Sequence, residues 1–217
     1  MLVATSTTFG IGNLTGMTHC SALDEGVVYA IRTHGSELPT ARSSRREMSA
    51  LAYEFLGLLA RKVISESADL PRAGIQDAGP HNDIGHDLGD GQGPVFKDAD
   101  GRPWVRGTGR DGANLSASIS HSRHVIAVAL ATRPGISVGI DIEYKDARRP
   151  VADMAEQLLL PRSASLDGFY QAWCRYEAVF KATGIIDPQA QKRVSPIEEH
   201  VPKLPAGFAG HLVVTAF

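Results

Sequence analysis

The chain has 217 residues, of which 43% are hydrophobic and 21% are charged. This composition excludes an intrinsically disordered chain, and a chain of this length buries well over half of its unfolded surface when it folds. The formal net charge of −2 argues against a polybasic nucleic-acid binder.

The cysteines and the apolar runs exclude further classes of protein. Cys20 and Cys174 lie far apart, without CxxC or Cys/His spacing, so the sequence indicates neither a disulfide framework nor a zinc site. The apolar runs are shorter than the ~18 residues of a membrane span, and the first residues lack the pattern of a signal peptide. We therefore expect a cytoplasmic protein without membrane contact.

The first predicted elements are a strand and a long helix. Residues 26–34 (GVVYAIRTH) are rich in β-branched and aromatic side chains, which is typical of a strand. In residues 43–67, apolar side chains recur at helical spacing behind Ser44, which is suited to cap a helix. A basic cluster at the start of this helix is either solvated or an anion contact: Arg42, Arg45 and Arg46.

Glycine, aspartate and proline dominate residues 73–103. A segment of this length without regular elements is unusual in a compact domain, so we expect residues 73–100 to form a flexible or functional loop. The tetrapeptide DADG (98–101) is similar to the start of a calcium-binding loop, but the later ligand positions are absent. A tight turn is therefore the better interpretation.

The rest of the chain reads as strands and helices in alternation. Residues 116–131 are predicted to form one largely buried strand, and residues 136–143 a second strand after Pro134 and Gly135. Helices over 151–160 and 166–184 and a closing strand over 206–217 follow. We expect an N-terminal half, 1–134, and a C-terminal half, 135–217, each with the strand, helix, strands order of an α+β fold.

The strand VGIDIE (138–143) carries two carboxylates within an apolar run. Because side chains alternate in direction along a strand, Asp141 and Glu143 lie on one face, ~7 Å apart along the backbone. This geometry suits a divalent cation, and it equally suits a strand with one wet face.

The helix predicted over 166–184 carries the second group of candidate residues. Its buried stripe is predicted from aromatic residues at helical spacing: Phe169, Trp173, Tyr176 and Phe180. Glu177 and Lys181 flank this stripe, four residues apart. They form either an exposed pair of little energetic weight or two charges that border a cleft.

Taken together, VGIDIE and WCRYEAVFKATG (173–184) resemble the paired signature of the 4'-phosphopantetheinyl transferases, a G-x-D-x-E strand followed by a W-x-x-K-E-A-x-x-K helix. Three weaker motifs of that family are matched in order by DGRPWV (100–105), SISHS (118–122) and LPAGFAGHLVV (204–214). The resemblance covers residues 101–217. It implies the larger type of transferase, a pseudodimer of two similar α+β halves with coenzyme A in the cleft between them.

The resemblance also implies a reaction and its residues. A serine of an apo acyl or peptidyl carrier protein would attack the phosphorus that bears the pantetheine arm of coenzyme A, with release of 3',5'-ADP. The implied Mg²⁺ ligands are Asp141, Glu143 and Glu177. The implied catalytic residues are Glu177 as acceptor of the serine proton, Lys181 and His121, and the implied cofactor-binding residues are Arg102, Pro103, Ser120, His121 and Lys181.

The negative charges of Asp141, Glu143 and Glu177 would also require a cation if they converged. Three carboxylates converging at ~5 Å would repel one another by ~3 kcal/mol per pair at an effective dielectric constant of about 20. Mg²⁺ takes oxygen ligands from one or two carboxylates together with substrate phosphates and water. Two acids on a semi-buried strand therefore make sense as half of a metal site that Glu177 completes.

The sequence departs from the family pattern at Tyr176, which stands where the family helix has its first lysine. Tyrosine is neutral near pH 7, so one cationic contact to phosphate is missing. Tyr176 is then a core aromatic or the donor of a hydroxyl bond, and Arg175 or the Arg42–Arg46 cluster would supply the missing charge.

Two alternatives to an active transferase stay open. One is a catalytically impaired family member that acts as a coenzyme A or carrier-protein binding module. The other is an unrelated Mg²⁺-dependent phosphohydrolase that uses the same acids.

His121 is either a phosphate contact or a strand-end histidine with local hydrogen bonds. We expect a monomer, because two halves in one chain already form a cleft.

Overall fold

The structure is a computed structural model that describes residues 17–24, 26–34, 43–66, 94–107, 113–162 and 164–216. Its strands are β1 (Met17–Leu23), β2 (Val27–Thr33), β3 (Val95–Lys97), β4 (Pro103–Val105), β5 (Leu115–Ser122), β6 (Val125–Ala131), β7 (Ile136–Tyr144), β8 (Glu198–His200) and β9 (Phe208–Ala216). Its helices are α1 (Ser43–Glu66), α2 (Val151–Gln157), α3 (Leu166–Thr183) and α4 (Pro188–Gln191). The predicted α+β class is confirmed.

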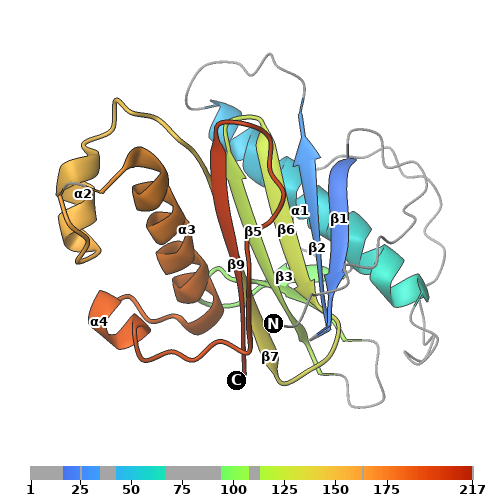
Figure 1. The fold of residues 1–217 in the computed structure, drawn as a ribbon. Coiled ribbons are helices and arrows are strands. Elements are labelled where there is room, and N and C mark those ends of the chain that lie inside the picture. Colours follow the sequence, from blue (N-terminus) through green and yellow to red (C-terminus); the bar gives the residue numbers. More distant parts are fainter. Residues whose placement is uncertain are drawn as a thin grey trace.

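The strands form two antiparallel sheets (Figure 1). A six-stranded sheet has the order β1-β2-β6-β5-β4-β3, and a three-stranded sheet has the order β7-β9-β8. The second sheet begins where the second half of the chain was predicted to begin. The expected similarity of the two halves is not tested by this arrangement and stays a prediction.

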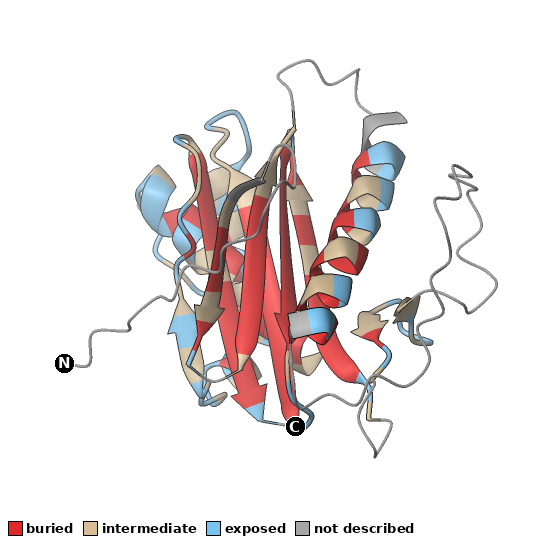
Figure 2. Cartoon of the chain, turned by 90° about the vertical axis from the view of Figure 1, so that its right-hand side faces the viewer, coloured by how far each residue is buried: buried red, intermediate tan, exposed pale blue. Residues whose placement is uncertain are grey.

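Three apolar interfaces stack the elements into layers. The buried side chains of α1 pack on one face of β2, β5 and β6. In Figure 2 the red, buried side of the long helix faces the strands. The opposite face of β2 and β6 packs against β7 and β9, so the two sheets share one core. The outer face of β7 and β9 is covered by α3. The longest helix of each half therefore lies outside, with the two sheets between them.

The predicted single strand over residues 116–131 is wrong, because β5 and β6 are the two arms of a hairpin. Ser122 is paired with Val125, and Arg123 adopts a positive φ of 51° in the two-residue connection. The turn contains neither glycine nor asparagine, the usual signals of such a connection. The Arg123 guanidinium lies 3.3 Å from the centroid of the Tyr144 ring, a tertiary contact that local sequence does not reveal.

The aromatic stripe predicted on α3 is also displaced. Of its four members only Phe169 is buried. The other buried residues of α3 are Tyr170 and four smaller side chains: Cys174, Ala178, Val179 and Ala182. The reason is close packing at Gly139, where a Cβ would lie only 1.9 Å from the carbonyl oxygen of Ala178. Small side chains on the helix and no side chain on the strand let the two backbones approach.

The tight turn predicted at DADG is confirmed between β3 and β4. The Asp98 carboxylate accepts hydrogen bonds from the backbone N–H of Asp100 and Arg102 and from the Trp104 indole, and Gly101 has a φ of 79°. The hydrogen bond from Trp104 is the main reason why the pKa of Asp98 is below its usual range. The last part of the predicted loop is thus ordered into a hairpin.

Several expectations fall on residues outside the described ranges. They include the flexibility of residues 67–93, the side chains of Ser44 and Arg45, and Arg42. Arg46 is described and exposed. None of the helices in the described part of the chain is both long enough and apolar enough to cross a membrane.

Candidate active site

A cavity of about 700 Å³ opens between α1 and α3, where β5 and β7 run past each other. It is lined by residues of both halves, including Ser49 and Tyr53 of α1 and Phe180 of α3. Seven of the residues proposed from the sequence lie on its wall: Arg102, Pro103, Ser120, His121, Asp141, Glu143 and Lys181. The fold therefore brings together these seven side chains, although they are up to about eighty positions apart in the chain.

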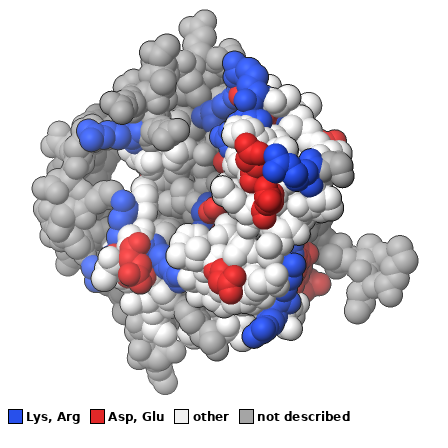
Figure 3. All heavy atoms as spheres, turned by 90° about the vertical axis from the view of Figure 1, so that its left-hand side faces the viewer, with Lys and Arg blue, Asp and Glu red and all other residues white. Residues whose placement is uncertain are grey.

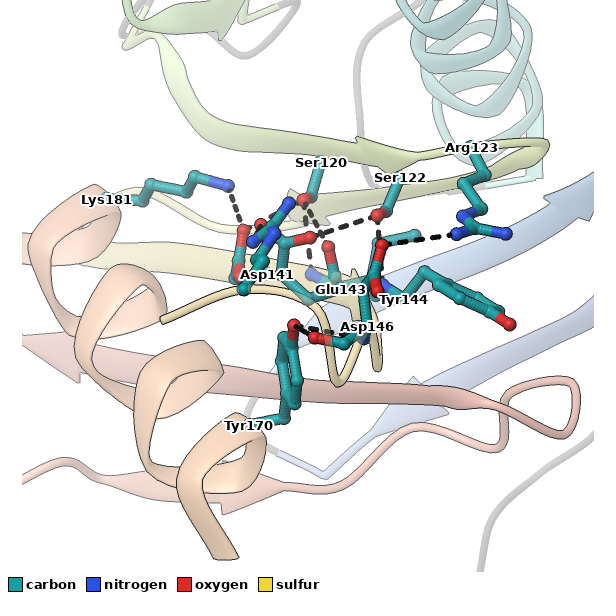
Figure 4. Close-up of polar contacts among 11 residues, drawn as sticks. Ser120, Ser122, Arg123, Asp141, Glu143, Tyr144, Asp146, Tyr170 and Lys181 are labelled. Atoms are coloured by element: carbon teal, nitrogen blue, oxygen red, sulfur yellow. Dashed lines mark hydrogen bonds and ion pairs between the residues drawn. The ribbon is translucent and has the colours of Figure 1, made fainter. Parts of the chain in front are cut away.

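Alternation along β7 places the carboxylates on the correct face. Val138, Ile140 and Ile142 point into the core shared by the two sheets. Asp141 and Glu143 point to the opposite side, where Asp141 contacts Lys181 of α3 and Glu143 contacts Ser122 of β5 (Figure 4). Asp141 is nearly inaccessible, with 5% of its surface exposed. A charge at that depth requires hydrogen bonds or counter-charges.

Asp141 receives both kinds of contact on one oxygen (Figure 4). The Ser120 hydroxyl donates to Oδ1 over 2.9 Å, and the Lys181 ammonium lies 2.7 Å from the same atom. Lys181 also donates to the carbonyl oxygen of Ile140 over 3.1 Å. The other oxygen, Oδ2, is buried and accepts no hydrogen bond from the described residues.

Glu143 is held in a parallel manner by the next serine of β5. The Ser122 hydroxyl donates to its Oε2 over 3.0 Å, and the Arg149 guanidinium lies 3.5 Å from its Oε1. Ser122 was not among the residues proposed from the sequence. The signal that could have identified it is the alternation of serines in SISHS, which puts Ser120 and Ser122 on one face of β5.

Glu177 lies on α3, within electrostatic reach of the two carboxylates of β7, but it is not among the residues that line the cavity. Burial raises its pKa above the usual range, and the negative charges of Asp141 and Glu143 add to this effect, whereas Lys181 opposes it. Within the described ranges, no group of three or more His, Cys, Asp or Glu side chains is arranged to hold a metal ion. The three-ligand metal site therefore stays a prediction.

Cys174 is buried beside the same carboxylates. Burial raises the pKa of its thiol above the usual range, and the charge of Asp141 raises it further. A thiolate is the reactive form of cysteine, so Cys174 acts here as a small apolar residue against β7 rather than as a nucleophile.

His121 and Arg102 complete the wall, His121 beside α1 and Arg102 beside the end of α3. The Nε2 atom of His121 lies 3.1 Å from the Ser49 hydroxyl. The Arg102 guanidinium rests against Gly184, the left-handed residue that ends α3, so closely that a Cβ there would collide with it. Arg102 thus links the β3–β4 turn to the end of α3, and it adds a second cation to the wall that carries Lys181.

The two residues considered for the missing lysine have other partners. The Tyr176 hydroxyl donates to the carbonyl oxygen of Ile186 over 2.7 Å, and its half-buried ring packs near Trp173. Arg175 makes a two-pronged contact with Glu199 over 2.8 and 2.7 Å. Neither lies on the wall of the cavity.

On the face that carries α2 and α3, described positive and negative side chains are interspersed (Figure 3).

Comparison of the chain with models of known protein families and with curated proteins finds no match.

Proposed function

We propose that this protein is a 4'-phosphopantetheinyl transferase built from two similar α+β halves. The observation that supports this function is the shared cavity. Residues from the β3–β4 turn, β5, β7 and α3, each selected from a separate motif, line a single space between the two halves. Four motifs that were selected separately along the chain thus meet in one cavity, as a shared site requires.

The size of the cavity suits a nucleotide-containing substrate such as coenzyme A. Its volume of about 700 Å³ falls in the usual range of ligand pockets. Its wall carries Asp100, Asp141 and Glu143 against Arg102 and Lys181, so a bound cation would have to offset the excess negative charge. Arg102 and Lys181 supply positive charge, and His121 and Ser49 supply hydrogen-bonding groups. Catalysis of phosphoryl transfer consists mainly of positioning and of charge stabilisation, and these residue types provide both.

In the proposed reaction, the hydroxyl oxygen of a carrier-protein serine forms a bond to the phosphorus that bears the pantetheine arm. The bond from that phosphorus to the oxygen of the 3',5'-ADP group breaks, and 3',5'-ADP leaves with the electron pair. Glu177 accepts the serine proton.

The chemistry of the donor set, carboxylates from β7 and α3, supports a divalent cation. Asp141 has a buried oxygen without a hydrogen-bond donor in the described part of the chain, and the negative charges of Asp141 and Glu143 add to the effect of burial on the pKa of Glu177. Asp141, Glu143 and Glu177 would hold Mg²⁺, which when bound would neutralise the pyrophosphate of coenzyme A. Lys181 would move its ammonium from Asp141 to the substrate phosphate.

A second candidate function is a coenzyme A or carrier-protein binding module without turnover. The hydrogen bond from the Tyr176 hydroxyl to the backbone of Ile186 favours it. At this position the family has a lysine that contacts phosphate, whereas here the side chain holds the backbone. We place the transferase first because Asp141, Glu143, Glu177 and Lys181 are all present.

The test is a transfer assay read by intact-protein mass spectrometry. Purified protein, coenzyme A and Mg²⁺ are incubated with a panel of apo acyl and peptidyl carrier proteins. We expect a carrier to gain one phosphopantetheine in an Mg²⁺-dependent manner, with the gain abolished by Asp141→Asn. Asp167→Asn, an exposed acid on α3 outside the cavity, is the matched control and should keep activity.

The outcomes separate the candidates. Binding of coenzyme A without a mass gain on any carrier would refute the transferase in favour of the binding module. Release of 3',5'-ADP without a carrier would favour a phosphohydrolase. The proposal includes a cytoplasmic monomer whose partner is a carrier protein and which contacts neither nucleic acid nor membrane.

A further inference from the structure

Four serines of β5 form a regular ladder with β7, the first strand of the second sheet. The hydroxyls of Ser116, Ser118, Ser120 and Ser122 each accept a hydrogen bond from a backbone N–H twenty-two residues later. The donors are Val138, Ile140, Ile142 and Tyr144, at 3.1, 3.0, 3.1 and 2.9 Å. Serine side chains thus satisfy backbone groups that a further strand would otherwise satisfy.

The four serines differ in the group that faces the hydroxyl and can accept a hydrogen bond from it. One position earlier on β7, the residues facing the rungs are Ser137, Gly139, Asp141 and Glu143 in order. Ser116 lies 3.4 Å from the hydroxyl of Ser137, and Gly139 offers no side chain to Ser118. Ser120 and Ser122 instead donate to the carboxylates of Asp141 and Glu143. The same backbone geometry therefore meets a carboxylate only at the last two rungs.

We propose that Ser120 and Ser122 are positioning residues, which fix the carboxylates of Asp141 and Glu143 for binding a divalent cation, whereas Ser116 and Ser118 only join the strands. Each of the two hydroxyls is held by the backbone of β7 and directs its proton to one carboxylate oxygen. For Asp141, Oδ1 is occupied by Ser120 and Lys181, and the buried Oδ2 is left as the oxygen without a donor in the described part of the chain.

Burial makes this arrangement rigid. Ser120 is 7% exposed and Asp141 is 5% exposed, so water cannot readily replace the hydroxyl. Partners that orient metal-binding carboxylates commonly change metal affinity by about 10–100-fold when they are removed. The inference rests on the cation site of the proposed function, and Ser118 offers a matched control because it is 3% exposed and makes the same backbone contact.

The experiment compares Ser118→Ala, Ser120→Ala and Ser122→Ala in the full chain. Mn²⁺ affinity is measured by calorimetry or electron paramagnetic resonance, and the thermal midpoint is measured in chelator. All three variants lose one acceptor of a backbone N–H, so we expect each to lower the metal-free midpoint by about 2–4 °C. Ser120→Ala and Ser122→Ala should lower it further, because they also remove a donor to a carboxylate. Only Ser120→Ala and Ser122→Ala should weaken Mn²⁺ binding, by about tenfold or more. Ser120→Thr and Ser122→Thr keep the hydroxyl and should restore the affinity.

Equal Mn²⁺ affinities in the three alanine variants would overturn the inference, because the serines would then be purely structural. An unchanged affinity in Ser122→Ala, which lies at the end of the ladder, would do so even if Ser120→Ala failed to fold. Absence of Mn²⁺ and Mg²⁺ binding by the unmodified protein would refute the inference together with the metal site. Normal Mn²⁺ binding without carrier modification would refute the transferase alone and leave the serine roles intact.

Discussion

Replacement of Lys181 by methionine tests how strongly the cavity depends on its internal ion pair. The ammonium lies 2.7 Å from Asp141 Oδ1, and the two side chains are 26% and 8% exposed. At an effective dielectric constant of 20, charges at this distance attract by about 6 kcal/mol before desolvation is subtracted. Removal of one partner of a buried pair typically costs about 3–5 kcal/mol, and the partial exposure of the lysine favours the lower end. We expect Lys181→Met to reduce the free energy of unfolding by about 3 kcal/mol.

The assay is urea unfolding followed by tryptophan fluorescence at pH 7, in chelator and at low salt. Lys145→Met is the matched control: Lys145 lies 2.8 Å from Asp167, but that carboxylate is 76% exposed. Screening should limit its effect to less than about 1 kcal/mol. In the double variant Lys181→Met with Asp141→Asn, much of the loss should be recovered, because the buried charge is gone. Equal effects of the two lysine substitutions would refute the argument from burial.

Three further predictions concern packing, titration and the tyrosine. Gly139→Ala should destabilise the fold by about 3 kcal/mol in the same urea assay, because the new methyl would collide with the backbone of α3, whereas Gly57→Ala, with no atom nearer than 3.7 Å, should stabilise helix α1 by about 1 kcal/mol. The raised pKa of Glu177 means that the native state binds its proton more tightly than the unfolded state, so its contribution to stability is present at pH 4 and is lost as pH rises through the folded pKa. Glu177→Gln should therefore be more stable than the unmodified protein at pH 7 in chelator, with the advantage vanishing at pH 4; an equal advantage at both values would contradict the assignment. Tyr176→Phe removes an exposed hydrogen bond and should cost about 1 kcal/mol, while Tyr176→Lys should raise the transfer rate if a phosphate contact is missing; a lower rate would argue that the hydroxyl bond matters more.

Local spacing was sufficient for the elements whose signal is a long, regular pattern. The helices around residues 43–66 and 166–183 and the strand at 136–144 were predicted correctly, because an apolar period that persists over many residues matches only one type of regular element. The same alternation along β7 placed Asp141 and Glu143 on one face. Motif spacing then selected seven residues that line one cavity.

The tertiary structure decided what depends on partners distant in the chain. The contact between Arg123 in the hairpin and Tyr144, and the close approach of α3 to the strand at Gly139, both join residues that are distant in the chain. The alternation in SISHS puts Ser120 and Ser122 on one face, but only the position of β5 beside β7 brings their hydroxyls to Asp141 and Glu143. By itself, the sequence determined which residues carry charge and which strand and helix faces present them. Only the packing of the layers decided which buried charge is paired, since desolvation and hydrogen bonding depend on neighbours that the fold brings together.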